Sequence, residues 1–185
     1  TGALLGDGEL SAWARQRIPG VLSRAYLPRY GCWASGLRRD GSLDAGVTWW
    51  IAAELDQAAA TLALTDRRYT GYLEKTYACW LERLVDRGDG EVWSWVSLDD
   101  PARRGGKQHL WKNGYHSAEH ALVSYLTSQE LHGKPATLHF AFAKAPPADE
   151  LRPYFFAGSP VRVEESALEG APGLRRVRVD FRGLR

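Results

Sequence analysis

An internal repeat is the feature that most constrains the fold of this chain. Residues 50–54 read Trp-Ile-Ala-Ala-Glu and residues 115–119 read Tyr-His-Ser-Ala-Glu, an offset of 65 residues. In each segment an aromatic residue precedes an Ala-Glu pair, so the aromatic residue and the glutamate lie about one turn apart near the start of a helix. Each segment also follows a predicted helix, strand and loop. We therefore expect helical hairpins that stack side by side, with the functional site at the end that carries the strand-bearing loops.

Hydrophobic periodicity predicts four helices, over residues 9–26, 49–64, 67–86 and 114–131. Pro19 interrupts the first, which we expect as one kinked helix or two short ones. Thr48, Asp66 and Asn113 are the expected N-caps of the other three, because their side-chain oxygens can accept hydrogen bonds from the first free amides of a helix.

Short alternating or aromatic-rich runs predict strands over residues 32–37, 91–97, 137–142, 152–156, 161–165 and 174–181. The last four runs follow Gly133 and are separated by Pro and Gly residues. We therefore expect two domains, a helical one in residues 1–133 and a small β-rich extension in residues 134–185.

Charge and hydropathy exclude several classes of partner. The 185 residues carry 24 basic and 22 acidic side chains, and the basic ones form only short pairs, so we expect no nucleic-acid partner. No apolar run reaches the roughly 18 residues of a membrane-spanning helix and no signal-peptide pattern is present, so we expect no membrane partner. Cys32 and Cys79 are too few for a disulfide framework and suggest a reducing compartment, so we expect a cytoplasmic protein.

Aromatic side chains are unusually dense, with eight tryptophans and eight tyrosines in a chain of 25% charged residues. Such side chains build large cores, and they also stack on the faces of pyranose sugars. Composition alone does not separate these two uses.

Two histidines and a glutamate, His116, Glu119 and His120, stand within five residues at the start of the last predicted helix. A helix that begins near Gly114 places both imidazoles on one face. Apolar residues such as Tyr115 form a stripe on the other side, and a helix that is apolar on two faces is buried. The histidines are therefore expected to line an enclosed space.

Three interpretations of this segment are open. A histidine on a buried helix is often a hydrogen-bonded core residue. Residues 116–120 also spell H-x-x-E-H, the inverted zinc-protease motif, which needs a third ligand that the motif does not supply. In the third interpretation a neutral imidazole transfers protons at the mouth of a sugar pocket, with Trp111 as a stacking plate and Lys112 as a cationic donor.

Residues 49–54, Trp-Trp-Ile-Ala-Ala-Glu, and residues 111–116, Trp-Lys-Asn-Gly-Tyr-His, resemble the C-terminal part of the N-acylglucosamine 2-epimerase family. The likeness extends over about residues 9–132. The family fold is an (α/α)6 barrel, so the resemblance implies a mainly α chain that holds the last four helices as two helical hairpins, with a small C-terminal β appendix. It also implies a sugar 2-epimerase or aldose–ketose isomerase that acts on a mono- or disaccharide.

The resemblance assigns roles to individual residues. His116 corresponds to one of the family's two acid–base histidines, Trp111 to a sugar-stacking tryptophan, and the Trp49–Trp50 pair contains another. The remaining candidate substrate-binding residues are Glu54, Lys112, Glu119 and His120. For Lys112, a loop residue, a salt bridge is expected in preference to a ligand contact. Glu119 is expected either to orient an imidazole or bind a hydroxyl, or to satisfy buried backbone or arginine partners.

Epimerisation of this kind needs a base with a pKa near the working pH, which removes the proton beside the sugar carbonyl to give an enediol. It needs neither a metal ion nor nicotinamide. We therefore expect no bound metal and no cofactor.

The family's second catalytic histidine lies in a Gly-His-x-x-Glu-Trp type segment, and this sequence contains none. The chain also begins at Thr1 and lacks methionine. We therefore expect an incomplete site, completed by the preceding part of the same polypeptide or by a second copy in a homodimer. The non-enzymatic alternative is a carbohydrate-binding or assembly module that keeps the tryptophans without turnover.

Overall fold

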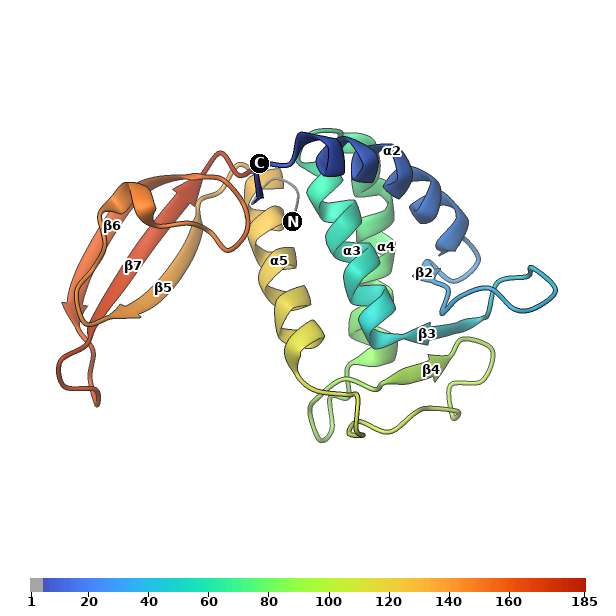
Figure 1. Ribbon diagram of the computed structural model, residues 1–185. Helices are drawn as coiled ribbons and strands as arrows, with labels where there is room; N and C mark the ends of the chain where they lie inside the picture. The colour runs from blue at the N-terminus through green and yellow to red at the C-terminus, as the bar shows by residue number, and fades with distance from the viewer. Residues whose placement is uncertain (1–4) are drawn as a thin grey trace. The chain divides into compact units, whose positions relative to one another are not determined.

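The computed structural model describes residues 5–185, which divide into two compact units (Figure 1). The first unit extends to Ser124 and the second runs from Tyr125 to Arg185, so the division falls inside helix α5 (Tyr115–Leu131). The structure is 40% helical and 23% strand. The chain therefore has a mixed α and β structure, and the expectation of a mainly α chain is corrected, because short strands join the helices and two of the three C-terminal strands are longer than predicted.

The first unit contains helices α2 (Gly8–Ala25), α3 (Trp49–Ala63) and α4 (Thr70–Cys79). Helix α2 is continuous, with Pro19 inside it, and Asp7 caps it by accepting a hydrogen bond from the amide of Leu10 at 2.8 Å. A 3₁₀ helix, η1 (Arg67–Tyr69), precedes α4, and a π-helical turn, η2 (Trp80–Leu84), follows it.

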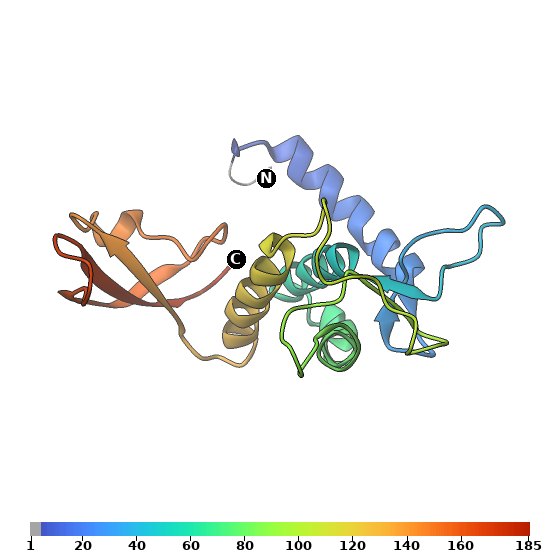
Figure 2. The same ribbon diagram turned by 90° about the horizontal axis from the view of Figure 1, so that it is seen from below.

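Helices α3 and α4 form an antiparallel hairpin and lie side by side in both views (Figures 1 and 2). The buried face of α3 consists largely of alanines, at positions 52, 53, 59, 60 and 63. Small side chains let two helix backbones approach closely, and alanine has the highest helix propensity, so this sequence forms a tightly packed central helix. Asp66 begins the second arm of the hairpin by accepting from the amide of Arg68 at 3.0 Å, which confirms it as a cap.

Four short strands lie in the connecting loops of the first unit: β1 (Tyr26–Leu27), β2 (Cys32–Trp33), β3 (Gly46–Thr48) and β4 (Trp95–Ser97). They pair as two antiparallel ladders, β1 with β2 and β3 with β4. Strand β3, which the sequence did not predict, leads directly into α3. The predicted side-chain cap by Thr48 is wrong, because its hydroxyl lies 2.9 Å from that of Ser35 and makes no bond to the helix amides.

A disulfide joins Cys32 on β2 to Cys79 at the end of α4. The expectation that the two cysteines stay reduced is therefore wrong. They are 47 residues apart in the sequence, and only the packing of β2 against α4 brings their Cα atoms to 5.6 Å.

The second unit is a three-stranded antiparallel sheet in the order β5 (Ala136–Phe142), β7 (Arg175–Arg182), β6 (Ser159–Ala167). One face of the central strand is fully buried, through Val177, Val179 and Phe181. The predicted strand over residues 152–156 is wrong, because this segment turns after the 3₁₀ helix η3 (Ala148–Glu150) and buries Phe156.

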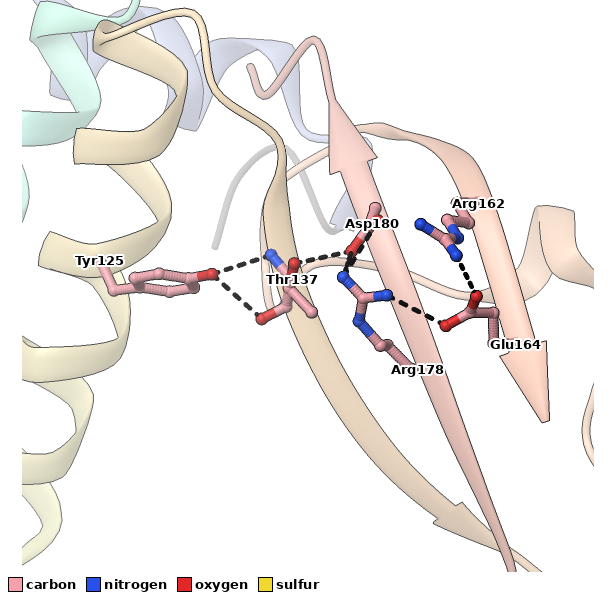
Figure 3. Close-up of polar contacts among 6 residues, drawn as sticks. All are labelled: Tyr125, Thr137, Arg162, Glu164, Arg178 and Asp180. Atoms are coloured by element: carbon pink, nitrogen blue, oxygen red, sulfur yellow. Dashed lines mark hydrogen bonds and ion pairs between the residues drawn. The ribbon is translucent and has the colours of Figure 1, made fainter. Parts of the chain in front are cut away.

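The opposite face of this sheet carries a chain of polar contacts, shown in Figure 3. Thr137 exchanges hydrogen bonds with the Tyr125 hydroxyl and donates from its own hydroxyl to Asp180 at 2.6 Å. Arg178 bridges Asp180 and Glu164, at 3.1 and 3.0 Å. These bonds satisfy the nearly buried Asp180 carboxylate and fix the register of the three strands.

Within residues 5–185, no helix combines the length and the apolar character that crossing a bilayer requires.

Candidate functional site

The candidate site lies where the first turns of α3 and α5 meet. The Asn113 side chain accepts from the amide of Tyr115 at 2.9 Å, and the first helical bond runs from Ala118 to the carbonyl of Gly114 at 2.9 Å. Asn113 therefore caps α5 as predicted, with the helix starting one residue later. This cap places His116 in the first turn of α5, close to the start of α3.

His116 pairs with Glu54 of α3, with 3.0 Å between the imidazole Nδ1 and the carboxylate Oε1. A carboxylate only accepts hydrogen bonds, so Nδ1 carries the proton. In the neutral imidazole, Nε2 then has the free lone pair and can act as a base. The side chains of His116 and Glu54 are 28% and 51% exposed, so the pair is reachable from solvent.

Three aromatic rings surround the His116 imidazole. The rings of Trp49 and Trp50 lie 6.3 Å from it between centroids, and that of Tyr115 lies 5.1 Å away. Trp49 and Tyr115 each form an edge-to-face contact with the imidazole, whereas the plane of Trp50 is tilted by 42° from the imidazole plane. The imidazole is thus held in a mostly apolar wall with one carboxylate, an arrangement suited to a ligand that has both apolar faces and hydroxyls.

The three predicted stacking tryptophans differ in exposure. Trp49 is 6% exposed, Trp50 is 44% exposed and Trp111 is 80% exposed. The indole nitrogen of Trp49 has no hydrogen-bond partner among the described residues. In this chain Trp50 and Trp111 therefore have faces open to a ligand, while Trp49 supports the site from behind.

Lys112 points inward instead of toward solvent. Its ammonium lies 3.0 Å from the Glu91 carboxylate and 5.5 Å from the centre of the Trp49 ring, and its side chain is 1% exposed. Glu91 accepts from the amide of Val92, and this bond, followed by the Lys112 ion pair, holds the pKa of Glu91 below its usual value. Lys112 thus makes the salt bridge expected of it and also braces Trp49 through a cation–π contact.

Glu119 lies on the same helix face as the site. It accepts from the Tyr115 hydroxyl at 3.0 Å. Glu54, His116 and Glu119 each offer an atom that could bind a metal ion, a carboxylate oxygen or an imidazole nitrogen, and these three atoms lie within 4.8 Å of one another. Among the described residues this is the one cluster of that kind. Glu119 is therefore close enough to His116 and Glu54 to contact the same bound molecule.

His120 occupies a different environment from His116. Its Nε2 lies 2.8 Å from the Asp56 carboxylate, its ring stacks on Trp80 at 4.0 Å, and it is 5% exposed. It is absent from the group formed by Glu54, His116 and Glu119. The structure therefore does not bring the two imidazoles of the H-x-x-E-H segment to one set of ligand atoms, because His120 pairs with Asp56 and stacks on Trp80.

Sequence reasoning missed two residues of this region, Asp56 and Glu91. Asp56 is 1% exposed and stands on the alanine face of α3, so a charged residue at a buried helical position was the signal that could have found it. Glu91 has a positive φ of 69°, which is uncommon for a residue other than glycine. Its pairing with Lys112 depends on the loop conformation and left no pattern in the sequence.

About two thirds of this chain shares the fold of a part of two solved sugar epimerases. One solved structure, a cellobiose 2-epimerase from Spirochaeta thermophila DSM 6192, is 24% identical with a TM-score of 0.54, over 68% of this chain and 33% of its own. A sugar epimerase from a ruminal bacterium is 18% identical with a TM-score of 0.54, over 69% of this chain and 34% of its own. The chain thus spans about a third of the length of either structure.

The resemblance inferred from residues 49–54 and 111–116 is confirmed at the level of the fold, which is what a likeness at these identities shows. No protein-family model matches the sequence, and no curated protein matches it.

Proposed function

We propose that this chain forms the C-terminal part of a sugar 2-epimerase or aldose–ketose isomerase, in which its helices contribute to an (α/α)6 barrel. The observation that carries the proposal is the His116–Glu54 pair, 3.0 Å apart and ringed by Trp49, Trp50 and Tyr115, in a chain with the fold of sugar epimerases.

In the proposed reaction the free Nε2 of His116 removes the proton from C2 of an open-chain aldose. The electron pair moves to form the C1–C2 double bond, and the C1 carbonyl oxygen takes up a proton to give an enediol. Glu54 stabilises the imidazolium that forms, because a carboxylate beside Nδ1 favours the charged ring. Return of a proton to C2 from the opposite face gives the epimer, and return to C1 gives the ketose.

Substrate binding would use the open faces of Trp50 and Trp111 as stacking plates, with Glu119 accepting from a sugar hydroxyl. Trp49 and Lys112 would act from behind by holding the wall of the site in place. No resident metal or cofactor is required, because the imidazole and the enediol carry the proton and the electron pair.

The second acid–base group would come from outside this chain, since inversion at C2 needs a proton donor on the other face of the sugar. The preceding part of the same polypeptide and a second copy in a homodimer are the two sources we propose. The cytoplasmic location expected from the sequence rested on reduced cysteines, whereas the Cys32–Cys79 disulfide is a feature more common in oxidising compartments.

Proton NMR of aldoses incubated with the full-length protein in D₂O tests this proposal. We expect deuterium at C2 of an aldose, with an epimer or a ketose as product and no loss of rate after treatment with a chelator. Loss of exchange with chelator and its recovery with zinc would overturn the metal-free mechanism. Sugar binding without any exchange would support a carbohydrate-binding module.

A further inference from the structure

A buried polar cluster lies beside the His116–Glu54 pair and is not part of the proposed chemistry. Its centre is the Asp56 carboxylate, which is 1% exposed. Asp56 accepts from Trp33 Nε1 at 2.7 Å, from the Thr76 hydroxyl at 2.5 Å and from His120 Nε2 at 2.8 Å. The cluster therefore connects four elements, β2, α3, α4 and α5, through one side chain.

The ring of His120 is fixed in orientation as well as in position. It stacks on Trp80 with 4.0 Å between centroids and 27° between planes, and the edge of Tyr77 meets it at 5.7 Å. The carboxylate of Asp56 requires a proton on Nε2. A ring held by stacking on one side and by a buried acceptor at one nitrogen has little freedom to rotate.

The disulfide reinforces this cluster from two directions. Trp33 follows Cys32 directly and Trp80 follows Cys79 directly in the sequence, and these two cysteines are bonded to each other. Trp33, which donates to Asp56, and Trp80, which stacks on His120, are therefore each next to a cysteine of the same disulfide.

The buried bond and the exposed bond join the same two helices. Glu54 and Asp56 stand two residues apart on α3, and His116 and His120 stand four apart on one face of α5. The Glu54–His116 pair is partly exposed, and such pairs contribute little to holding elements in place. A fully buried carboxylate with three donors resists displacement far more strongly, because any lost donor leaves it unsatisfied.

We infer that Asp56 and His120 are positioning residues, which set the rotation of α5 against α3 so that His116 meets Glu54 through Nδ1 and keeps Nε2 free for proton transfer. This inference rests on the proposed function for its meaning in catalysis. The inference predicts which imidazole nitrogen of His116 carries the proton, and this can be measured whether or not the protein turns over a sugar.

The test is long-range ¹H–¹⁵N NMR of histidine-labelled full-length protein, with exchange at C2 of the aldose measured in parallel. Two variants remove the bond in different ways. Asp56→Asn keeps the shape and removes the charge, and His120→Phe keeps the stacking on Trp80 and removes the hydrogen bond. Asp180→Asn is the matched control, since Asp180 is a nearly buried carboxylate that belongs to the other unit.

In the unaltered protein we expect His116 to show the Nδ1–H form when neutral. Both variants should shift it toward the Nε2–H form that imidazole prefers in water and slow exchange by roughly 10- to 100-fold, the size expected for a misplaced catalytic group. The control should leave the tautomer unchanged. If Asp56→Asn does not fold, His120→Phe decides the matter.

A folded variant in which His116 keeps the Nδ1–H form would overturn the inference. The proposed function fails separately, if the unaltered protein shows no exchange although the tautomer shifts as described.

Discussion

Opening the Cys32–Cys79 disulfide should lower the free energy of unfolding by about 4 kcal/mol. The cross-link closes a loop with a sequence separation of 47, and the chain-entropy model for a loop of this length gives about 4 kcal/mol at 25 °C. Reduction leaves both sulfur atoms in their buried positions, so the loss measures the cross-link and not the removal of core atoms. Cys32 and Cys79 are 1% and 7% exposed, so replacing them would add a packing cost.

Urea unfolding followed by tryptophan fluorescence, with and without a phosphine reductant, measures this difference. The Cys32→Ala/Cys79→Ala double variant is the control, and its unfolding midpoint should not respond to the reductant. Equal midpoints for the unaltered protein in both conditions would show that the cross-link does not constrain the unfolded chain, and the reasoning would be refuted.

Two further predictions concern the loops that carry the site. Gly46→Ala should destabilise the protein by about 1–3 kcal/mol in urea unfolding, because a Cβ there would lie 2.3 Å from Nε1 of Trp95. Gly71→Ala in α4 is the control: a Cβ there meets open space, so this variant should be more stable by about 0.4–1 kcal/mol. Equal effects of the two substitutions would contradict the packing argument. The pKa of Glu91 is lowered, first by the hydrogen bond from the amide of Val92 and then by Lys112. The ionised Glu91 therefore stabilises the folded protein above the unfolded pKa of about 4.3, and this stabilisation is lost as the pH falls through the lower folded pKa. Glu91→Gln should therefore lose less stability than the unaltered protein between pH 7 and pH 3, and an identical loss in both would show that the carboxylate does not contribute.

Local patterns predicted the helices well. The last predicted helix, 114–131, matches α5 at Tyr115–Leu131, because Asn113 and the apolar periodicity act within a few residues of the chain. The short strand β3 was missed because its three residues carry no alternation of their own. It forms by pairing with β4, which lies far away in the sequence.

Long-range pairing explains what sequence reasoning could not find in the site. The motif around His116 identified one partner of the central pair, and Glu54 was a candidate from the repeat, but nothing local indicated that the two would meet. Asp56 and the disulfide depend in the same way on how β2, α4 and α5 pack around α3. His116 and His120 share one helix face in the sequence, and only the structure shows that His120 is buried against Asp56 and Trp80 whereas His116 meets Glu54.

The most direct measurement of the central claim is the rate of deuterium incorporation at C2 of an aldose by the His116→Gln variant of the full-length protein. We expect the rate to fall by roughly 10²- to 10⁴-fold, the usual contribution of a general acid–base group, and Glu54→Gln to reduce it by at least about tenfold. His132→Gln is the matched control, since His132 lies just beyond the other end of α5 and its Nδ1 lies 2.8 Å from the carbonyl of Ser128; it should leave the rate unchanged. An unchanged rate in His116→Gln would contradict the account.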